Sequence, residues 1–194
     1  MFIARPADSA ETANVYQSSI DAQGYVTNLS RAWAWRPDVF HGFVALRNQL
    51  MSESHLSNRD YAVMVCATAS ELGDSYCSLA WGKILSKEAG AGIAAAVISD
   101  SAGGDLSQRD RTIAGWARKV VANPNATRSS DVDALREIGL SEREIFEATA
   151  FIAFRLAFAS VNDALGIHPD AKLFETTPAE VRTAVTFGRS AADA

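Results

Sequence analysis

Residues 56–81 of this 194-residue chain read LSNRDYAVMVCATASELGDSYCSLAW and carry the strongest structural signal in the sequence. A helix can begin at Ser57 or Asn58, because their side chains can accept hydrogen bonds from the free N–H groups of a first turn. Gly73 can end this helix, since glycine readily adopts the left-handed conformation of a helix C-terminus. Asp74 can then cap a second helix. The stretch therefore predicts two consecutive helices joined by a tight turn.

The rest of the chain repeats this helical pattern. Apolar residues recur at spacings of three and four, and alternating runs of β-branched residues are nearly absent. We therefore predict an all-α fold in a single domain covering residues 1–194, with a core at about 20–170. The expected helices cover residues 9–23, 37–51, 57–72, 74–87, 93–99, 107–121, 129–138 and 141–166, with a loop at 100–105 and a tail helix after Thr177-Pro178.

The longest predicted helix begins at Ser141-x-x-Glu144, a capping box. Its residues 145–165 are apolar on most sides, whereas a helix on the surface of a bundle needs only one apolar stripe. Such a helix is typically buried within a bundle or at a subunit interface. This pattern predicts a homo-oligomer.

Composition excludes several other classes of protein. The net charge of −5 argues against a nucleic-acid partner, which needs clustered positive charge. The longest apolar stretch, 148–161, contains Arg155 and is shorter than a membrane span. Residues 1–13 lack the features of a signal peptide, so we expect a cytoplasmic protein. Two cysteines make no disulfide framework, and the three histidines show no metal-ligand spacing, so no metal or cofactor is expected.

Residues 56–81 resemble the core of the alkylhydroperoxidase D / carboxymuconolactone decarboxylase family, in the branch called peroxidase-related proteins. Residues 117–124, 135–141 and 163–170 follow the C-terminal pattern of that family, and Arg36-Pro37 matches its N-terminal lead. The resemblance covers most of residues 20–170. It implies an alkylhydroperoxidase D-like helical bundle built around a helical hairpin, assembled as a dimer, trimer or hexamer.

The active-site motif of the family is largely replaced in this chain. The resemblance implies a glutamate, then Cys-x-Tyr-Cys, then a histidine four residues after the second cysteine. Here Ala62 stands at the glutamate position, Asp74 at the first cysteine and Trp81 at the histidine. Tyr76 and Cys77 match the second half of the cysteine motif.

The family resemblance implies that the second cysteine attacks a peroxide as a thiolate, that the first resolves the product, and that histidine and glutamate relay the proton. Cys77 can still be a nucleophile, because the positive end of a helix N-terminus lowers the pKa of a thiol. The carboxylate of Asp74 works against this effect. Trp81 cannot act as a base, since indole only donates a hydrogen bond, and its ring should make the pocket drier and smaller. The alternative is that Cys77 is a small buried hydrophobic residue.

Two further residues are candidates for this site. Cys66 lies one turn from Ala62, so in the hairpin implied by the family it could face Cys77 as a displaced redox pair. We expect neighbouring, reduced thiols, and ordinary packing of Cys66 is the alternative. His41, in a helix beside two phenylalanines, could reach the site and replace the lost base, or serve a structural role.

Three functions remain open. The first is weak, thiol-dependent reduction of small organic hydroperoxides through Cys77. The second is a catalytically degenerate paralogue that serves assembly or binds a small apolar ligand. The third, a carboxymuconolactone decarboxylase-type lyase, is least favoured because the usual histidine is missing here. Arg109, Arg111, Arg118 and Lys119 are expected to form a solvated helix face.

Overall fold

The computed structural model describes residues 1–101 and 105–192, and this part of the chain contains helices and no strand. The prediction of an all-α fold is therefore confirmed. The predicted loop at 100–105 lies partly outside the described residues. The α-helices are α1 (Ala10–Gln23), α2 (Asn28–Trp33), α3 (Pro37–Ser52), α4 (Asn58–Leu72), α5 (Ser75–Ala89), α6 (Ala91–Ile98), α7 (Gln108–Ala122), α8 (Ser129–Glu137), α9 (Glu142–Ala164), α10 (Ala171–Thr176) and α11 (Ala179–Ala184), with a 3₁₀ turn at Pro124–Ala126.

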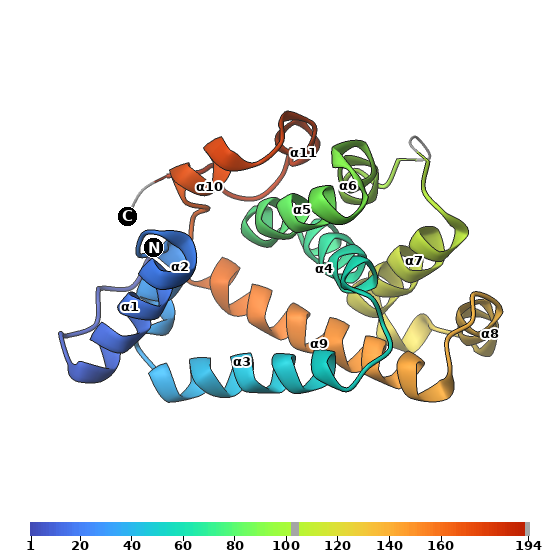
Figure 1. The fold of residues 1–194 in the computed structure, drawn as a ribbon, viewed down its shortest axis with the longest axis horizontal. Helices are drawn as coiled ribbons and strands as arrows, with labels where there is room; N and C mark the ends of the chain where they lie inside the picture. Colours follow the sequence, from blue (N-terminus) through green and yellow to red (C-terminus); the bar gives the residue numbers. More distant parts are fainter. Residues whose placement is uncertain (102–104, 193–194) are drawn as a thin grey trace.

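Helix α4 forms the centre of the molecule. It packs against α5, α6, α7 and α9, and every residue from Tyr61 to Ala69 is buried. Figure 1 shows α9 and α3 side by side below the α4–α5 pair, with α1 and α2 at one end and α7 and α8 at the other. Helix α3 differs from the others of its length, because none of its residues is fully buried.

The predicted caps of the central hairpin are present. The Ser57 hydroxyl accepts a hydrogen bond from the backbone N–H of Asp60, and Gly73 ends α4 with a φ of 81°. The Asp74 carboxylate accepts from the backbone N–H of Cys77, 2.9 Å away, and so opens α5. Helices α2 and α10 were not predicted, because six residues are too few for an apolar repeat to be recognised.

Helices α4 and α7 begin with the same pattern, Ser-x-Arg-Asp. The arginine of each helix binds the aspartate of the other, an arrangement called the arginine exchange below. Arg59 donates to both carboxylate oxygens of Asp110, at 2.9 and 2.6 Å. Arg109 donates to both oxygens of Asp60, at 2.8 and 3.0 Å. Each aspartate also accepts from the serine that caps its own helix. The expected solvated face of α7 is thus wrong for Arg109, whose charge is used to join two helix N-termini.

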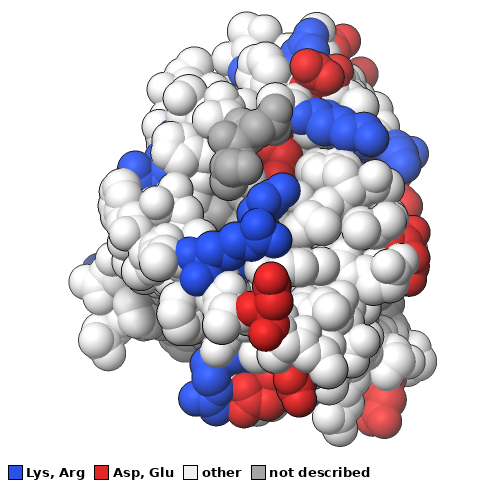
Figure 2. Space-filling view, turned by 90° about the vertical axis from the view of Figure 1, so that its left-hand side faces the viewer, with Lys and Arg blue, Asp and Glu red and all other residues white. Residues whose placement is uncertain are grey.

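At one end of the molecule, charged side chains of both signs are dispersed over the surface (Figure 2). Figure 2 shows the end of the molecule where α1 and α2 lie, with basic and acidic side chains scattered among wide uncharged areas. Helix α9 leaves apolar side chains outside as well, namely Phe146 (72% exposed), Phe154 and Val161. None of the described helices is long and apolar enough to cross a membrane.

Candidate functional site

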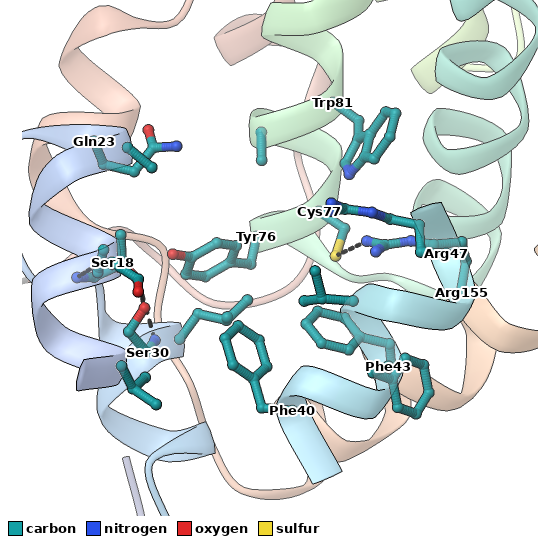
Figure 3. Close-up of a pocket in the computed structure, with 18 of the residues that line it drawn as sticks. Ser18, Gln23, Ser30, Phe40, Phe43, Arg47, Tyr76, Cys77, Trp81 and Arg155 are labelled. Atoms are coloured by element: carbon teal, nitrogen blue, oxygen red, sulfur yellow. Dashed lines mark hydrogen bonds between the residues drawn. The ribbon is translucent and has the colours of Figure 1, made fainter. Parts of the chain in front are cut away.

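A cavity of about 560 Å³ lies between the central hairpin and the helices that cover it. Helix α5 forms one wall, α9 a second and α3 a third, while α1 and the segment around α2 close the remaining side. Figure 3 shows side chains from these helices pointing into it. A volume of this size suits a small organic ligand. Its wall is mainly apolar, with a group of aromatic rings contributed by Phe40, Phe43, Trp81, Phe151, Phe154 and Phe158.

Cys77 lies on the wall of this cavity as the third residue of α5. The side chain is almost entirely buried, at 3% exposure. A guanidinium nitrogen of Arg155, Nη2, lies 3.3 Å from its Sγ (Figure 3). The Asp74 carboxylate accepts a hydrogen bond from the backbone N–H of Cys77. The thiol is therefore influenced by one positive and one negative group.

Burial and the negative charge of Asp74 raise the pKa of the Cys77 thiol well above its ordinary value, while Arg155 acts in the opposite direction. We expected the helix N-terminus to lower this pKa and Asp74 to oppose that effect. The net shift is upward, in the direction of burial and of Asp74. The resting thiol is thus protonated at neutral pH.

Asp74 is itself an unusual residue for a helix cap, because it is completely buried. Its Oδ2 atom has no hydrogen-bond partner among the described residues. Burial raises its pKa, whereas its hydrogen bond with Cys77 and the charge of Arg155 lower it. Burial and Asp74 also raise the pKa of the nearby Asp163, on α9, to about 6. Asp74 is therefore a buried carboxylate beside Cys77, with one oxygen bound to the backbone N–H of Cys77 and the other without a hydrogen-bond partner among the described residues.

Arg155 was missed as a site residue by sequence reasoning. Its guanidinium lies 5.4 Å from the ring centre of Trp81 and 4.9 Å from that of Phe158. Both distances are typical of cation–π contacts. A lone arginine within the apolar stretch 148–161 was the signal available, since a buried charge needs a specific partner. Trp81, at the position of the family histidine, thus holds a cation beside the sulfur.

The predicted site residues divide into two groups. The first group lines the cavity and consists of His41, Tyr76, Cys77 and Trp81. Asp74 is not among the lining residues, but it accepts a hydrogen bond from the backbone N–H of Cys77. The Tyr76 hydroxyl donates to Asp170 Oδ2 at 2.6 Å, so this tyrosine is bound to the residue that caps the N-terminus of α10. His41 lies on the wall next to Phe40.

Ala62 and Cys66 form the second group. Both are wholly buried in the core around α4, and neither lines the cavity. Burial raises the pKa of the Cys66 thiol, and Arg118 is the charge that acts on it, unlike the charges around Cys77. Both thiols are free and buried. The face-to-face contact of Cys66 with Cys77 stays a prediction. The described residues contain no cluster of three groups able to hold a metal ion.

The chain is similar to the alkylhydroperoxidase AhpD core of a peroxidase-related protein from Ralstonia eutropha JMP134, with 25% identity, a TM-score of 0.79, and 89% of this chain and 94% of that chain covered. A peroxidase-related protein from Silicibacter sp. TM1040 matches at 23% identity and a TM-score of 0.79, over 89% and 93% of the two chains. No protein-family profile and no curated protein matches.

The debrominase Bmp8 shares the fold at 15% identity, with a TM-score of 0.69 over 95% of this chain and 97% of that chain. An alanine-for-cysteine variant of Bmp8, with a TM-score of 0.70, was solved in complex with 2,3,4-tribromopyrrole. The fold is that of helical proteins with an alkylhydroperoxidase D core. Within that class, the chain is similar to proteins described as peroxidase-related.

Proposed function

We propose that this protein is a one-cysteine thiol enzyme that reduces small organic hydroperoxides in the cavity beside Cys77. The observation that carries the proposal is the position of Cys77 on the wall of a cavity, with its sulfur 3.3 Å from Arg155 Nη2 and its backbone N–H bound to Asp74. The peroxidase-related relatives support the same chemistry at the level of family.

Three side chains of the chain can perform the reaction. Asp74 accepts the proton of the Cys77 thiol, and the positive charge of Arg155 stabilises the thiolate that forms. The thiolate attacks the terminal oxygen of the hydroperoxide, the O–O bond breaks, and the departing alkoxide takes up the proton to leave as an alcohol. Cys77 becomes a sulfenic acid. An external thiol then condenses with it to release water, and a second external thiol reduces the mixed disulfide.

The proposed reaction is slow. The pKa of Cys77 is raised, so only a small fraction of the thiol is ionised at neutral pH. The proton relay that the family resemblance implies is replaced by Asp74 alone. General acid–base assistance contributes roughly 10²–10⁴-fold, so turnover should fall below that of motif-complete relatives by a factor within this range.

A second candidate is small-ligand binding without turnover. The same raised pKa of Cys77 favours it, because a protonated thiol is a poor nucleophile. The volume of the cavity and its aromatic wall also suit a ligand of small aromatic type. The complex of Bmp8 with a brominated pyrrole offers a precedent for such a ligand within this fold.

Peroxide turnover separates the two candidates. We expect slow consumption of cumene hydroperoxide with dithiothreitol, together with a sulfenic-acid adduct of dimedone on Cys77 detected by mass spectrometry. Cys77→Ser should remove both signals, and Cys66→Ser serves as the matched control that keeps them. Turnover that survives Cys77→Ser, or no adduct at any hydroperoxide concentration, would rule out the enzyme and leave the binding function.

A further inference from the structure

Two guanidinium groups meet at the Cys77 end of the cavity. Arg47 comes from α3 and Arg155 from α9, and both line the cavity. Figure 3 shows the two side chains next to each other and directed toward Cys77. Both are half-buried. Burial and the neighbouring charge of Arg155 lower the pKa of Arg47, which is the electrostatic signature of two cations in close proximity.

Neither arginine forms an ion pair with any carboxylate in the described part of the chain. Arg47 donates from Nε and Nη2 to a neutral acceptor, Oδ1 of Asn48, at 3.2 and 2.8 Å. Arg155 contacts the sulfur of Cys77, and its Nε atom is buried without a hydrogen-bond partner. By contrast, Arg59 and Arg109 each bind an aspartate through two nitrogens. The cavity therefore holds two positive charges with unused donors.

Asp74 and Asp170, two acidic residues beside the cavity, each accept at least one hydrogen bond from another group. Asp74 accepts a hydrogen bond from the backbone N–H of Cys77, and the positive charge of Arg155 also lowers its pKa. Asp170 accepts from the Tyr76 hydroxyl and from the backbone N–H of Asn28, on the wall formed by α2 and α10. Two like charges held close in a half-buried position repel each other. An oxyanion placed between them would offset this repulsion and could accept paired hydrogen bonds from guanidinium.

We propose that the cavity binds a small organic oxyanion, such as a carboxylate on an aromatic body, with the anionic group between Arg47 and Arg155. The aromatic rings of Phe40, Phe43 and Phe154 would surround the body of the ligand. This inference rests on the proposed function, because it names the substrate class of the same site. It predicts that the preferred hydroperoxides carry an acidic group.

Binding of three ligands with one ring system tests the proposal. 2-Naphthoate, naphthalene-2-sulfonate and the neutral 2-naphthamide are titrated calorimetrically into the Cys77→Ser protein, so that no reaction can occur. At least one of the two anions should bind about tenfold or more tightly than the amide, a difference of about 1.4 kcal/mol. The ranking of carboxylate and sulfonate identifies the preferred oxyanion. Equal affinity of both anions and the amide would overturn the proposal.

Two arginine variants locate the anion. Arg47→Met should abolish most of the preference for the anion while leaving amide binding within about twofold. Arg36→Met is the matched control, since Arg36 precedes α3, is 68% exposed and does not line the cavity. An unchanged preference in Arg47→Met would overturn the proposal. These titrations need no thiol, so the two proposals can fail separately. A protein that prefers the anions but turns over no peroxide would refute only the proposed enzyme. A protein that turns over peroxide but does not prefer the anions would refute only this inference.

Discussion

Cys77 has neighbours of opposite charge, Asp74 and Arg155, and together with burial they set how its reactivity changes with pH. Asp74 favours the protonated thiol, and Arg155 favours the thiolate. Burial adds to the effect of Asp74. Because both raise the pKa of Cys77 above its ordinary value, the reactive thiolate becomes abundant only in alkaline solution.

Alkylation by iodoacetamide should follow this ionisation. In a Cys66→Ser background, the rate should rise about tenfold per pH unit through neutral pH and level off only in alkaline solution, since the thiolate fraction grows in that proportion below the pKa. Asp74→Asn should move the midpoint to lower pH and speed alkylation at pH 7.5. Arg155→Met should move it to higher pH. A plateau already reached at pH 7 in the unmodified site would contradict the raised pKa.

The sequence located Cys77 but could not give its charge environment. Tyr76, Trp81 and His41 were placed at the site by position in the family pattern and by helix spacing, and all three line the cavity. Arg47 and Arg155 were not found, because each is brought to the sulfur by the packing of α3 and α9. Arg155 is 78 positions from Cys77, and Arg47 lies on a different helix, so neither contact can be inferred from local spacing in one sequence.

At the scale of helices, local signals were sufficient to locate the ends of α4 and the start of α5. Serine caps and Gly73 fixed the ends of α4, and Asp74 fixed the start of α5. The exchange of arginines between α4 and α7 was not predicted, although both helices begin with Ser-x-Arg-Asp. A capping box in the sequence indicates only local hydrogen bonds. The pairing of each arginine with the aspartate of the other helix depends on how α4 and α7 pack together.

This arginine exchange should contribute strongly to stability. Asp110→Asn leaves Arg59 without its partner and weakens the cap of α7, so we expect a loss of about 2–4 kcal/mol in the free energy of unfolding at pH 7. Salt bridges and hydrogen bonds lower the pKa values of Asp60 and Asp110. Their stabilisation is therefore present above the ordinary aspartate pKa and is lost as pH falls through the lowered values.

Urea unfolding measures this effect. The difference between the unmodified protein and Asp110→Asn should shrink below about pH 4, where aspartate is protonated in the unfolded chain. Asp133→Asn, which changes an exposed ion pair on α8, is the control and should cost less than about 1 kcal/mol. A loss at Asp110 that is as small as at Asp133 would contradict a structural role for the exchange.

Gly82 allows α5 to approach α6 and α11 closely. A Cβ atom at this position would lie 2.6 Å from Val181 Cγ1 and 2.9 Å from Ile98 Cδ1. Gly82→Ala should therefore lower stability by about 1–3 kcal/mol, despite the better helix propensity of alanine. Gly92→Ala, with no atom within 4 Å of the added Cβ, is the matched control and should be neutral or stabilising. Thermal unfolding of the two variants compares them, and equal midpoints would show that the helices can separate freely.

At the scale of the whole molecule, the outer face of α9 remains without a described neighbour. Phe146 is 72% exposed, and Val161 is exposed further along the same helix. We propose that this face forms a subunit interface, because large apolar side chains in water favour association. Sedimentation should show an oligomer at micromolar concentration, and Phe146→Glu should shift it toward monomer. A monomeric unmodified protein at that concentration would exclude the interface.

Helix α3 forms a wall of the cavity and yet has no fully buried residue. Because none of its sixteen residues is fully buried, local opening of this helix should cost less free energy than opening of α4 or α5. The exchange of its amide hydrogens with deuterium would report each opening. A ligand bridging Arg47 to Arg155 would join α3 to α9 and slow that exchange. The exchange rate of the amide hydrogens of α3 would therefore report whether the cavity is occupied.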